Sequence, residues 1–141
     1  VDDTCLATGE LLPVKDTPFD FNKRKRIGQD LEADHIQLKN AFGYDHSFVL
    51  NDTENQLTLE EPVSGRRLVI STTAPVVQVY TGNFLKDGCI GKAGRVYENR
   101  EGVALETQLM PNAINTEENP STILRKGDKF ESNTKYVFEI M

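Results

Sequence analysis

The stretch RLVISTTAPVVQVY, residues 67–80, decides the fold class. Its first part, 67–72, is rich in β-branched residues, and its last part, 76–80, alternates valine with polar residues. Alternation with a period of two is typical of a strand that is buried on one face. Pro75 separates the two parts and favours a turn between them. The stretch therefore predicts two successive strands joined by a short connection.

Similar strand patterns recur on both sides of this stretch. Residues 56–60 and 103–109 alternate apolar and polar side chains, and the run 135–140 is expected to bury Tyr136, Phe138 and Ile140. Many short strands separated by polar turns indicate an all-β protein built as a sandwich or barrel. We also expect one short helix around Gly28 to Asn40, where apolar residues are roughly helically spaced.

Two long segments lack a regular pattern. Residues 1–26 and 110–125 contain apolar side chains and prolines without helical or strand periodicity. Such segments in a compact domain are often functional or packed against something else. A partner chain or a missing domain would explain both.

Composition limits the classes of partner. The 141 residues form a chain of single-domain length with a net charge of -6. An acidic protein is a poor ligand for nucleic acid, and the basic cluster at residues 23–26 is interpreted as a solvated loop rather than a phosphate site. No stretch has the length of a membrane span. We expect Cys5 and Cys89 to be reduced thiols of a cytoplasmic protein.

Polar side chains gather on several predicted strands. In the run 103–109, Glu106 and Gln108 share a face opposite the apolar one, Gln78 lies on a second strand, and Asp45 with His46 begins a third. Carboxylates accept hydrogen bonds from hydroxyl groups and amides both donate and accept, so this set suits a sugar. The pattern alone favours a solvent-facing strand surface over a functional site.

Several passages, taken together and in order, resemble the aldose 1-epimerase (galactose mutarotase) family. They cover nearly the whole chain: LATGE at 6–10, TPFDF at 17–21, GYDHSFVL at 43–50, EPVSGR at 61–66, STTAP at 71–75, VQVYTGNFL at 77–85, LETQ at 105–108, MPNAIN at 110–115 and PSTILRKG at 120–127.

The resemblance implies an antiparallel β-sandwich of the mutarotase type, a large supersandwich of which residues 1–141 would be the C-terminal part. It implies interconversion of the α and β anomers of a hexose such as galactose or glucose, without a cofactor or a metal. By the matching motifs, Glu106 would be the general base that takes the proton of the C1 hydroxyl, and Asp45 and Gln78 would bind sugar hydroxyls.

Ring opening also requires an acid at the ring oxygen. The family places that histidine in the N-terminal half, and the motifs match neither His35 nor His46 to it; His46 is expected to pack or to orient Asp45. We therefore expect the acid to come from a missing N-terminal half, present as a separate chain or as part of a longer or fused enzyme.

Two alternatives remain open from the sequence. One is a non-catalytic sugar-binding module on the same scaffold. The other is a relative of the hexose-6-phosphate 1-epimerases, for which Arg66 is the candidate phosphate ligand.

Overall fold

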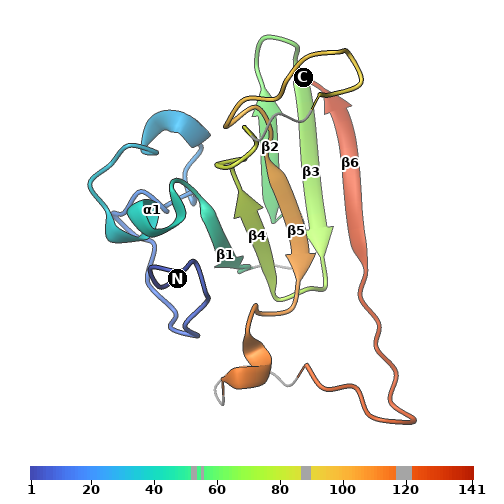
Figure 1. Ribbon diagram of the computed structural model, residues 1–141. Helices are drawn as coiled ribbons and strands as arrows, with labels where there is room; N and C mark the ends of the chain where they lie inside the picture. Colours follow the sequence, from blue (N-terminus) through green and yellow to red (C-terminus); the bar gives the residue numbers. More distant parts are fainter. Residues whose placement is uncertain (52–53, 55, 87–89, 117–121) are drawn as a thin grey trace. The chain divides into compact units, whose positions relative to one another are not determined.

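The computed structural model describes residues 1–51, 54, 56–86, 90–116 and 122–141. Two compact units divide the chain: Val1–His46 with Gln78–Leu105, and Ser47–Val77 with Glu106–Met141. The elements follow one another as drawn in Figure 1: η1 Ile27–Gln29, α1 Ile36–Ala41, β1 Asp45–Val49, β2 Leu57–Glu61, β3 Arg66–Thr72, β4 Val76–Tyr80, β5 Ala104–Gln108, η2 Ala113–Asn115 and β6 Thr134–Ile140.

The predicted strands all form, and their observed ends lie within one residue of the predicted ends. Within the described residues, six strands make two three-stranded sheets, with orders β1-β4-β5 and β2-β3-β6. The all-β class is therefore confirmed. The stretch 67–80 supplies β3 and β4, and Thr73-Ala74-Pro75 connects them, as the sequence indicates.

A tight hairpin joins β2 to β3 in the second unit. The two strands are antiparallel, with Leu59 opposite Leu68 and Glu61 opposite Arg66. The carboxylate of Glu61 accepts the backbone N–H groups of Val63 and Ser64 at 2.8 and 2.6 Å. Gly65 completes the turn at φ +71°, a conformation that costs glycine little because it has no Cβ.

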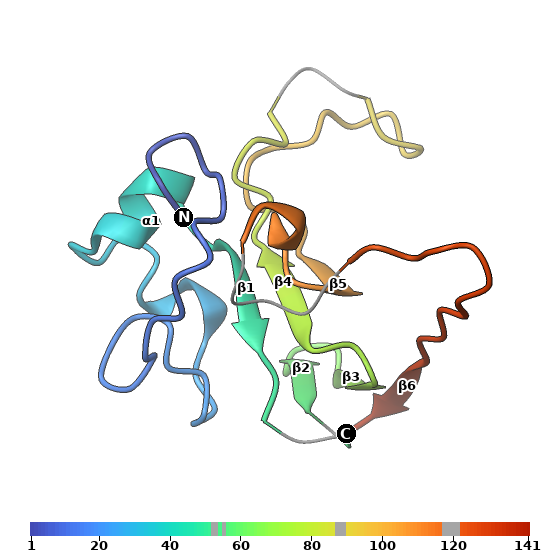
Figure 2. The same ribbon diagram turned by 90° about the horizontal axis from the view of Figure 1, so that it is seen from below.

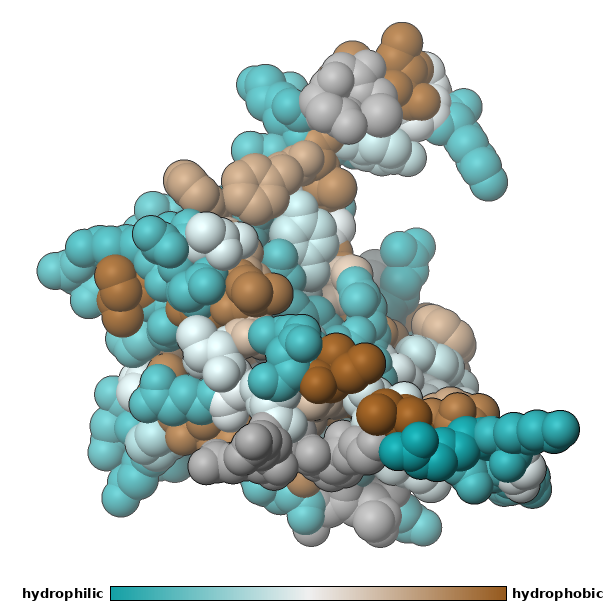
Figure 3. Space-filling view, turned by 60° about the horizontal axis from the view of Figure 1, so that its bottom comes forward, coloured by the Kyte–Doolittle hydropathy of each residue, from teal (hydrophilic) through white to brown (hydrophobic). Residues whose placement is uncertain are grey.

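Strand β6 corrects one prediction. It pairs antiparallel with β3, but Tyr136, Phe138 and Ile140 are 46%, 79% and 77% exposed rather than buried. Ile70, which lies opposite Tyr136, is 1% exposed, because it lies on the central strand with partners on both sides. Apolar side chains at the surface are also visible on the face drawn in Figure 3.

The predicted helix around Gly28 to Asn40 is wrong in its extent. A single turn of 3-10 helix, η1, and the six-residue α1 are separated by turns. The side chain of His35 caps α1, because its Nδ1 accepts the N–H of Gln37 at 3.2 Å. That cap fixes the start of α1 well inside the range the sequence predicts for one helix.

The start of the chain is bound to α1. The terminal amine of Val1 donates to Gln37 Oε1 at 2.6 Å, and Gln37 Nε2 and Asn40 Nδ2 donate to the carbonyl of Val1 at 3.0 and 3.1 Å. Figure 2 shows the N-terminus beside this helix. These hydrogen bonds therefore fix Val1 against α1, although the sequence there shows no strand or helix pattern.

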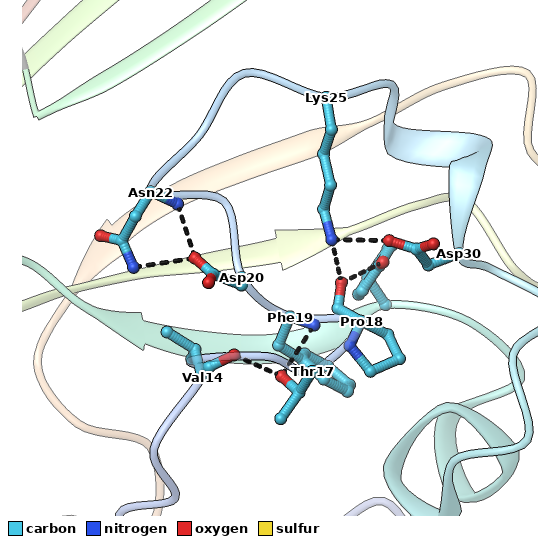
Figure 4. Close-up of polar contacts among 9 residues, drawn as sticks. Val14, Thr17, Pro18, Phe19, Asp20, Asn22, Lys25 and Asp30 are labelled. Carbon is cyan, nitrogen blue, oxygen red and sulfur yellow. Dashed lines mark hydrogen bonds and ion pairs between the residues drawn. The ribbon is translucent and has the colours of Figure 1, made fainter.

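The interpretation of the basic cluster at residues 23–26 as a solvated loop is only partly correct. Lys25 is largely buried, its Nζ donating to the carbonyl of Pro18 at 2.6 Å and pairing with Asp30 at 2.7 Å (Figure 4). The same Nζ lies 4.5 Å from the centre of the Phe21 ring. Lys23, Arg24 and Arg26 are exposed, as the sequence indicates. Lys25 thus ties the irregular segment 1–26 to the rest of its unit.

The irregular segment 110–125 is described only in part. It contains η2, whose Ala113 is buried, and residues 117–121 lie outside the described residues.

Candidate functional site

Two of the predicted site residues are in contact. Gln78, in β4, donates its side-chain N–H to Asp45 Oδ1, at the start of β1, at 2.7 Å. Both side chains are half-buried, and both residues belong to the first unit. Their separation in sequence is 33 residues, so the fold rather than local structure brings them together.

A buried polar network fixes the chain on either side of this pair. The Tyr44 amide donates to Thr81 Oγ1 at 3.1 Å, and the Thr81 amide donates back to the Tyr44 carbonyl at 3.0 Å. Asn83 donates to the carbonyls of Ala41 and Tyr44 at 2.8 and 3.1 Å and accepts from Thr81 Oγ1 at 2.7 Å. Asp45 and Gln78 are thus held by neighbours whose polar groups are satisfied.

Gly43 allows this network to close. Its φ is +140°, and a Cβ at this position would lie 2.4 Å from Asn83 Oδ1. Sequence reasoning assigned no role to Thr81 and Asn83, although the passage VQVYTGNFL contains both. Their role depends on contacts across about forty residues, which no local pattern reports.

His46 follows Asp45 in β1 and is half-buried. Its Nδ1 accepts the backbone N–H of Asp45 at 3.0 Å, and its ring packs edge-on against Phe19 at 4.8 Å between centroids. Nε2 has no hydrogen-bond partner within the part of the chain that the structure describes. Burial, with smaller effects from the N-terminal amine and His35, lowers the pKa of His46 from 6.5 to about 4.

This pKa predicts a stability loss in acid. Between pH 6.5 and about 4 the unfolded chain binds a proton at residue 46 that the folded chain excludes. The free energy of unfolding therefore falls as the pH drops through this window, by about 3 kcal/mol in all. We expect urea unfolding at pH 7 and pH 4 to show that the wild type loses about 3 kcal/mol more of its free energy of unfolding than His46→Gln does. Glutamine can accept the hydrogen bond from the Asp45 amide but does not titrate. Equal losses in both proteins would contradict the assignment.

Glu106 lies on β5 and is exposed. The next residue, Thr107, is half-buried and shares a hydrogen bond with Thr134 of β6 at 2.8 Å, which anchors this part of β5 within the second unit. Glu106 belongs to the second unit, and the Asp45–Gln78 pair belongs to the first.

The other residues considered from the sequence are found in the following positions. His35 caps α1, and the hydroxyl of Tyr80 accepts the amide of Phe84 at 2.9 Å. Arg66 is exposed on β3, opposite Ile140. Cys5 is an exposed free thiol whose Sγ lies 3.0 Å from the carbonyl of Asn40, whereas Cys89 and the predicted turn at Asp87-Gly88 lie outside the described residues.

The described helices offer no membrane crossing, since each lacks the necessary length and apolar character.

Similarity to known proteins extends over the whole chain. A family model described as aldose 1-epimerase matches residues 1–137. The galactose mutarotases of Sus scrofa and Homo sapiens are 38% identical over 143 aligned positions, and the aldose 1-epimerase of Haemophilus influenzae is 35% identical over 144. These matches cover 99% of this chain but only 40% or 41% of the relatives.

Solved structures agree with these relatives. An aldose epimerase homologue from C. elegans superimposes with a TM-score of 0.83 at 32% identity, covering 99% of this chain and 42% of the other. A galactose 1-epimerase from Lactobacillus acidophilus gives 0.75 at 29% identity, covering 99% and 40%. The mutarotase-type β-sandwich predicted from the motifs is therefore confirmed. From its residues 1–137 and its fold, this chain belongs to the aldose 1-epimerase family.

Proposed function

We propose that this chain is the C-terminal part of a hexose mutarotase and supplies its general base and part of its sugar site. The observation that carries the proposal is the bond between Gln78 and Asp45 in a member of the aldose 1-epimerase family. A carboxylate has about four acceptor positions, and the bond from Gln78 uses one of them. Asp45 therefore keeps acceptors for the hydroxyl groups of galactose or glucose.

The second element of the proposal is Glu106 as the base. Its exposed carboxylate, on a strand anchored by the Thr107–Thr134 bond, is open to a ligand.

The proposed reaction consists of proton transfers. Glu106 removes the proton of the C1 hydroxyl, the C1–O5 bond breaks as O5 gains a proton from an acid, and the open aldehyde forms. Rotation about C1–C2 presents the other face of the carbonyl, and the reverse steps close the ring. The products are the two anomers, and both proton carriers return to their starting states.

The acid belongs to the N-terminal half in this proposal. The chain has two histidines, and each already has a structural contact: His35 caps α1, and the ring of His46 packs against Phe19. We therefore expect the histidine that protonates O5 to reside outside these 141 residues. The exposed thiol of Cys5 suits the cytoplasmic location that we propose for the enzyme.

Polarimetry of freshly dissolved α-galactose tests the proposal. The chain is co-expressed with the N-terminal part of the Sus scrofa galactose mutarotase, so that neither part has to fold alone. We expect the purified pair to speed the approach to anomeric equilibrium well above buffer. A rate equal to buffer would sink the enzyme function, and galactose binding without exchange would identify the non-catalytic module. Preference for glucose 6-phosphate over glucose would favour the phosphate branch and Arg66.

The sugar-binding role of Asp45 predicts a loss of affinity. Asp45→Ala removes a charged acceptor, so we expect galactose affinity in the co-expressed pair to fall about 10-fold to 100-fold, equivalent to about 1.5–3 kcal/mol. Titration calorimetry measures this change. The control Asp34→Ala removes an exposed carboxylate that pairs with Lys39 at the surface, and it should bind as the wild type does. Equal affinities for Asp45→Ala and Asp34→Ala would remove Asp45 from the site.

A further inference from the structure

The backbone amide of Asp45 is bonded to the side chain of the next residue. β1 ends the sheet order β1-β4-β5, so β4 lies on one side of it (Figure 1). The carbonyl of Tyr44 accepts the amide of Thr81, the residue after β4, at 3.0 Å. Because positions bonded to the neighbouring strand alternate with positions whose N–H and C=O groups face away, the Asp45 amide faces away from β4. It donates instead to Nδ1 of His46 at 3.0 Å.

The imidazole of His46 also contacts a buried aromatic ring. It lies edge-on to Phe19, which is 8% exposed, at 4.8 Å between centroids. Successive side chains of a strand point to opposite faces, so the imidazole lies on the face opposite to the carboxylate of Asp45. That carboxylate accepts a hydrogen bond from Gln78 at 2.7 Å. His46 and Gln78 therefore hold Asp45 at two different points, its backbone amide and its side chain.

An imidazole at position 46 is less favourable for packing than a phenyl ring of similar size. Acceptance at Nδ1 requires the neutral tautomer with its proton on Nε2. Nε2 is buried and finds no hydrogen-bond partner among the residues that the structure describes. A buried donor without a partner is destabilising, whereas a phenylalanine ring would pack against Phe19 without such a donor. What the imidazole supplies and a phenyl ring cannot is an acceptor for the Asp45 amide.

We propose that His46 is a positioning residue of the sugar site. Through Nδ1 it fixes the backbone of Asp45, and it thereby directs the carboxylate that binds the hexose hydroxyls. This inference rests on the proposed function, because Asp45 is a sugar ligand only in that function. A group in a binding site has to be held within about 0.5 Å and about 20° of its working geometry, and its supporting contacts provide this. Loss of the bond should therefore weaken sugar binding without stopping proton transfer at Glu106.

Two substitutions of His46 separate positioning from packing. His46→Phe keeps an aromatic ring against Phe19 but has no acceptor for the Asp45 amide. His46→Asn places Oδ1 where Nδ1 stands and loses most of the ring. In the enzyme co-expressed with the N-terminal part of the Sus scrofa galactose mutarotase, we expect His46→Phe to raise KM for galactose about 3-fold to 10-fold with kcat nearly unchanged. His46→Asn should keep KM near the wild-type value.

The stabilities of the two variants should follow the opposite order. Urea denaturation should find His46→Phe the more stable of the two, because asparagine leaves a cavity beside Phe19. The matched control is His35→Phe. His35 Nδ1 accepts the amide of Gln37, and its ring lies 5.3 Å from the same Phe19 ring, so this variant loses an equivalent acceptor that is not bonded to Asp45. Its KM should equal that of the wild type.

Calorimetry of galactose binding to the same proteins gives a readout that does not depend on activity, so the two proposals fail separately. An inactive pair whose galactose affinity falls in His46→Phe and not in His46→Asn would refute the proposed enzyme function alone. Positioning alone would be refuted by an active pair in which His46→Phe keeps the wild-type KM, His46→Asn is the weaker binder, or His35→Phe raises KM as much as His46→Phe. A wild-type pair that binds no galactose would overturn both proposals.

Discussion

Glu106→Gln is expected to lower the rate of anomer exchange about 10²-fold to 10⁴-fold in the co-expressed enzyme, the range that a positioned general base contributes. Glutamine keeps the size of the side chain and its hydrogen bonds but cannot take the proton from the C1 hydroxyl. Because Glu106 is exposed on β5, the substitution should leave folding intact. Galactose affinity should change little, so the loss should appear in kcat and not in KM.

Two comparisons sharpen this experiment. Glu106→Asp keeps a carboxylate but withdraws it by one methylene, so it should retain more activity than Glu106→Gln. The control Glu101→Gln removes another exposed glutamate, which lies outside the described strands and pairs with Arg95. It should leave the exchange rate near that of the wild type. Exchange measured by NMR at saturating galactose gives all four rates. Activity of Glu106→Gln within a factor of two of the wild type would assign the base elsewhere.

Tyr44→Ala is expected to lower the free energy of unfolding by about 3–5 kcal/mol, the usual cost of removing a buried aromatic ring. Tyr44 is 0% exposed and contacts the rings of Phe19 and Phe21, each 5.3 Å away between centroids. Its hydroxyl donates to the Pro18 carbonyl at 2.7 Å, and burial raises its pKa to about 12. The ring therefore holds the irregular segment 1–26 against the core of its unit.

Tyr44→Phe separates the ring from the hydroxyl. The Pro18 carbonyl still accepts from Lys25 Nζ, so the loss should be only about 1 kcal/mol. Urea denaturation of both variants gives the two values. If Tyr44→Ala cost no more than Tyr44→Phe, the aromatic cluster would not be what anchors this segment.

The sequence predicted the strands well because their signals are local. β3 and β4 follow from β-branched runs and alternation in the stretch 67–80, and the turn at Pro75 follows from its backbone restriction. The ends of a helix are also determined locally. However, His35 is not a common capping residue, so the sequence did not reveal that α1 starts after it.

The errors concern contacts between distant parts of the chain. Burial of Phe138 was predicted from alternation, yet alternation reports only which face is apolar and not whether anything covers it. Lys25 was assigned to solvent with its basic neighbours, although Asp30 and the Pro18 carbonyl draw it inward. The residues of the candidate site came from ordered motifs, but the bond between Gln78 and Asp45 spans 33 residues and became visible only in the fold.

A crystal structure of the completed enzyme with galactose tests the central claim most directly. The account predicts a Glu106 carboxylate oxygen about 2.6–3.2 Å from the C1 hydroxyl oxygen, within the reach of a general base. It also predicts hydrogen bonds from ring hydroxyls to Asp45 and Gln78 in the same site. Galactose bound away from Asp45 and Gln78, or with Glu106 out of reach of C1, would contradict the account.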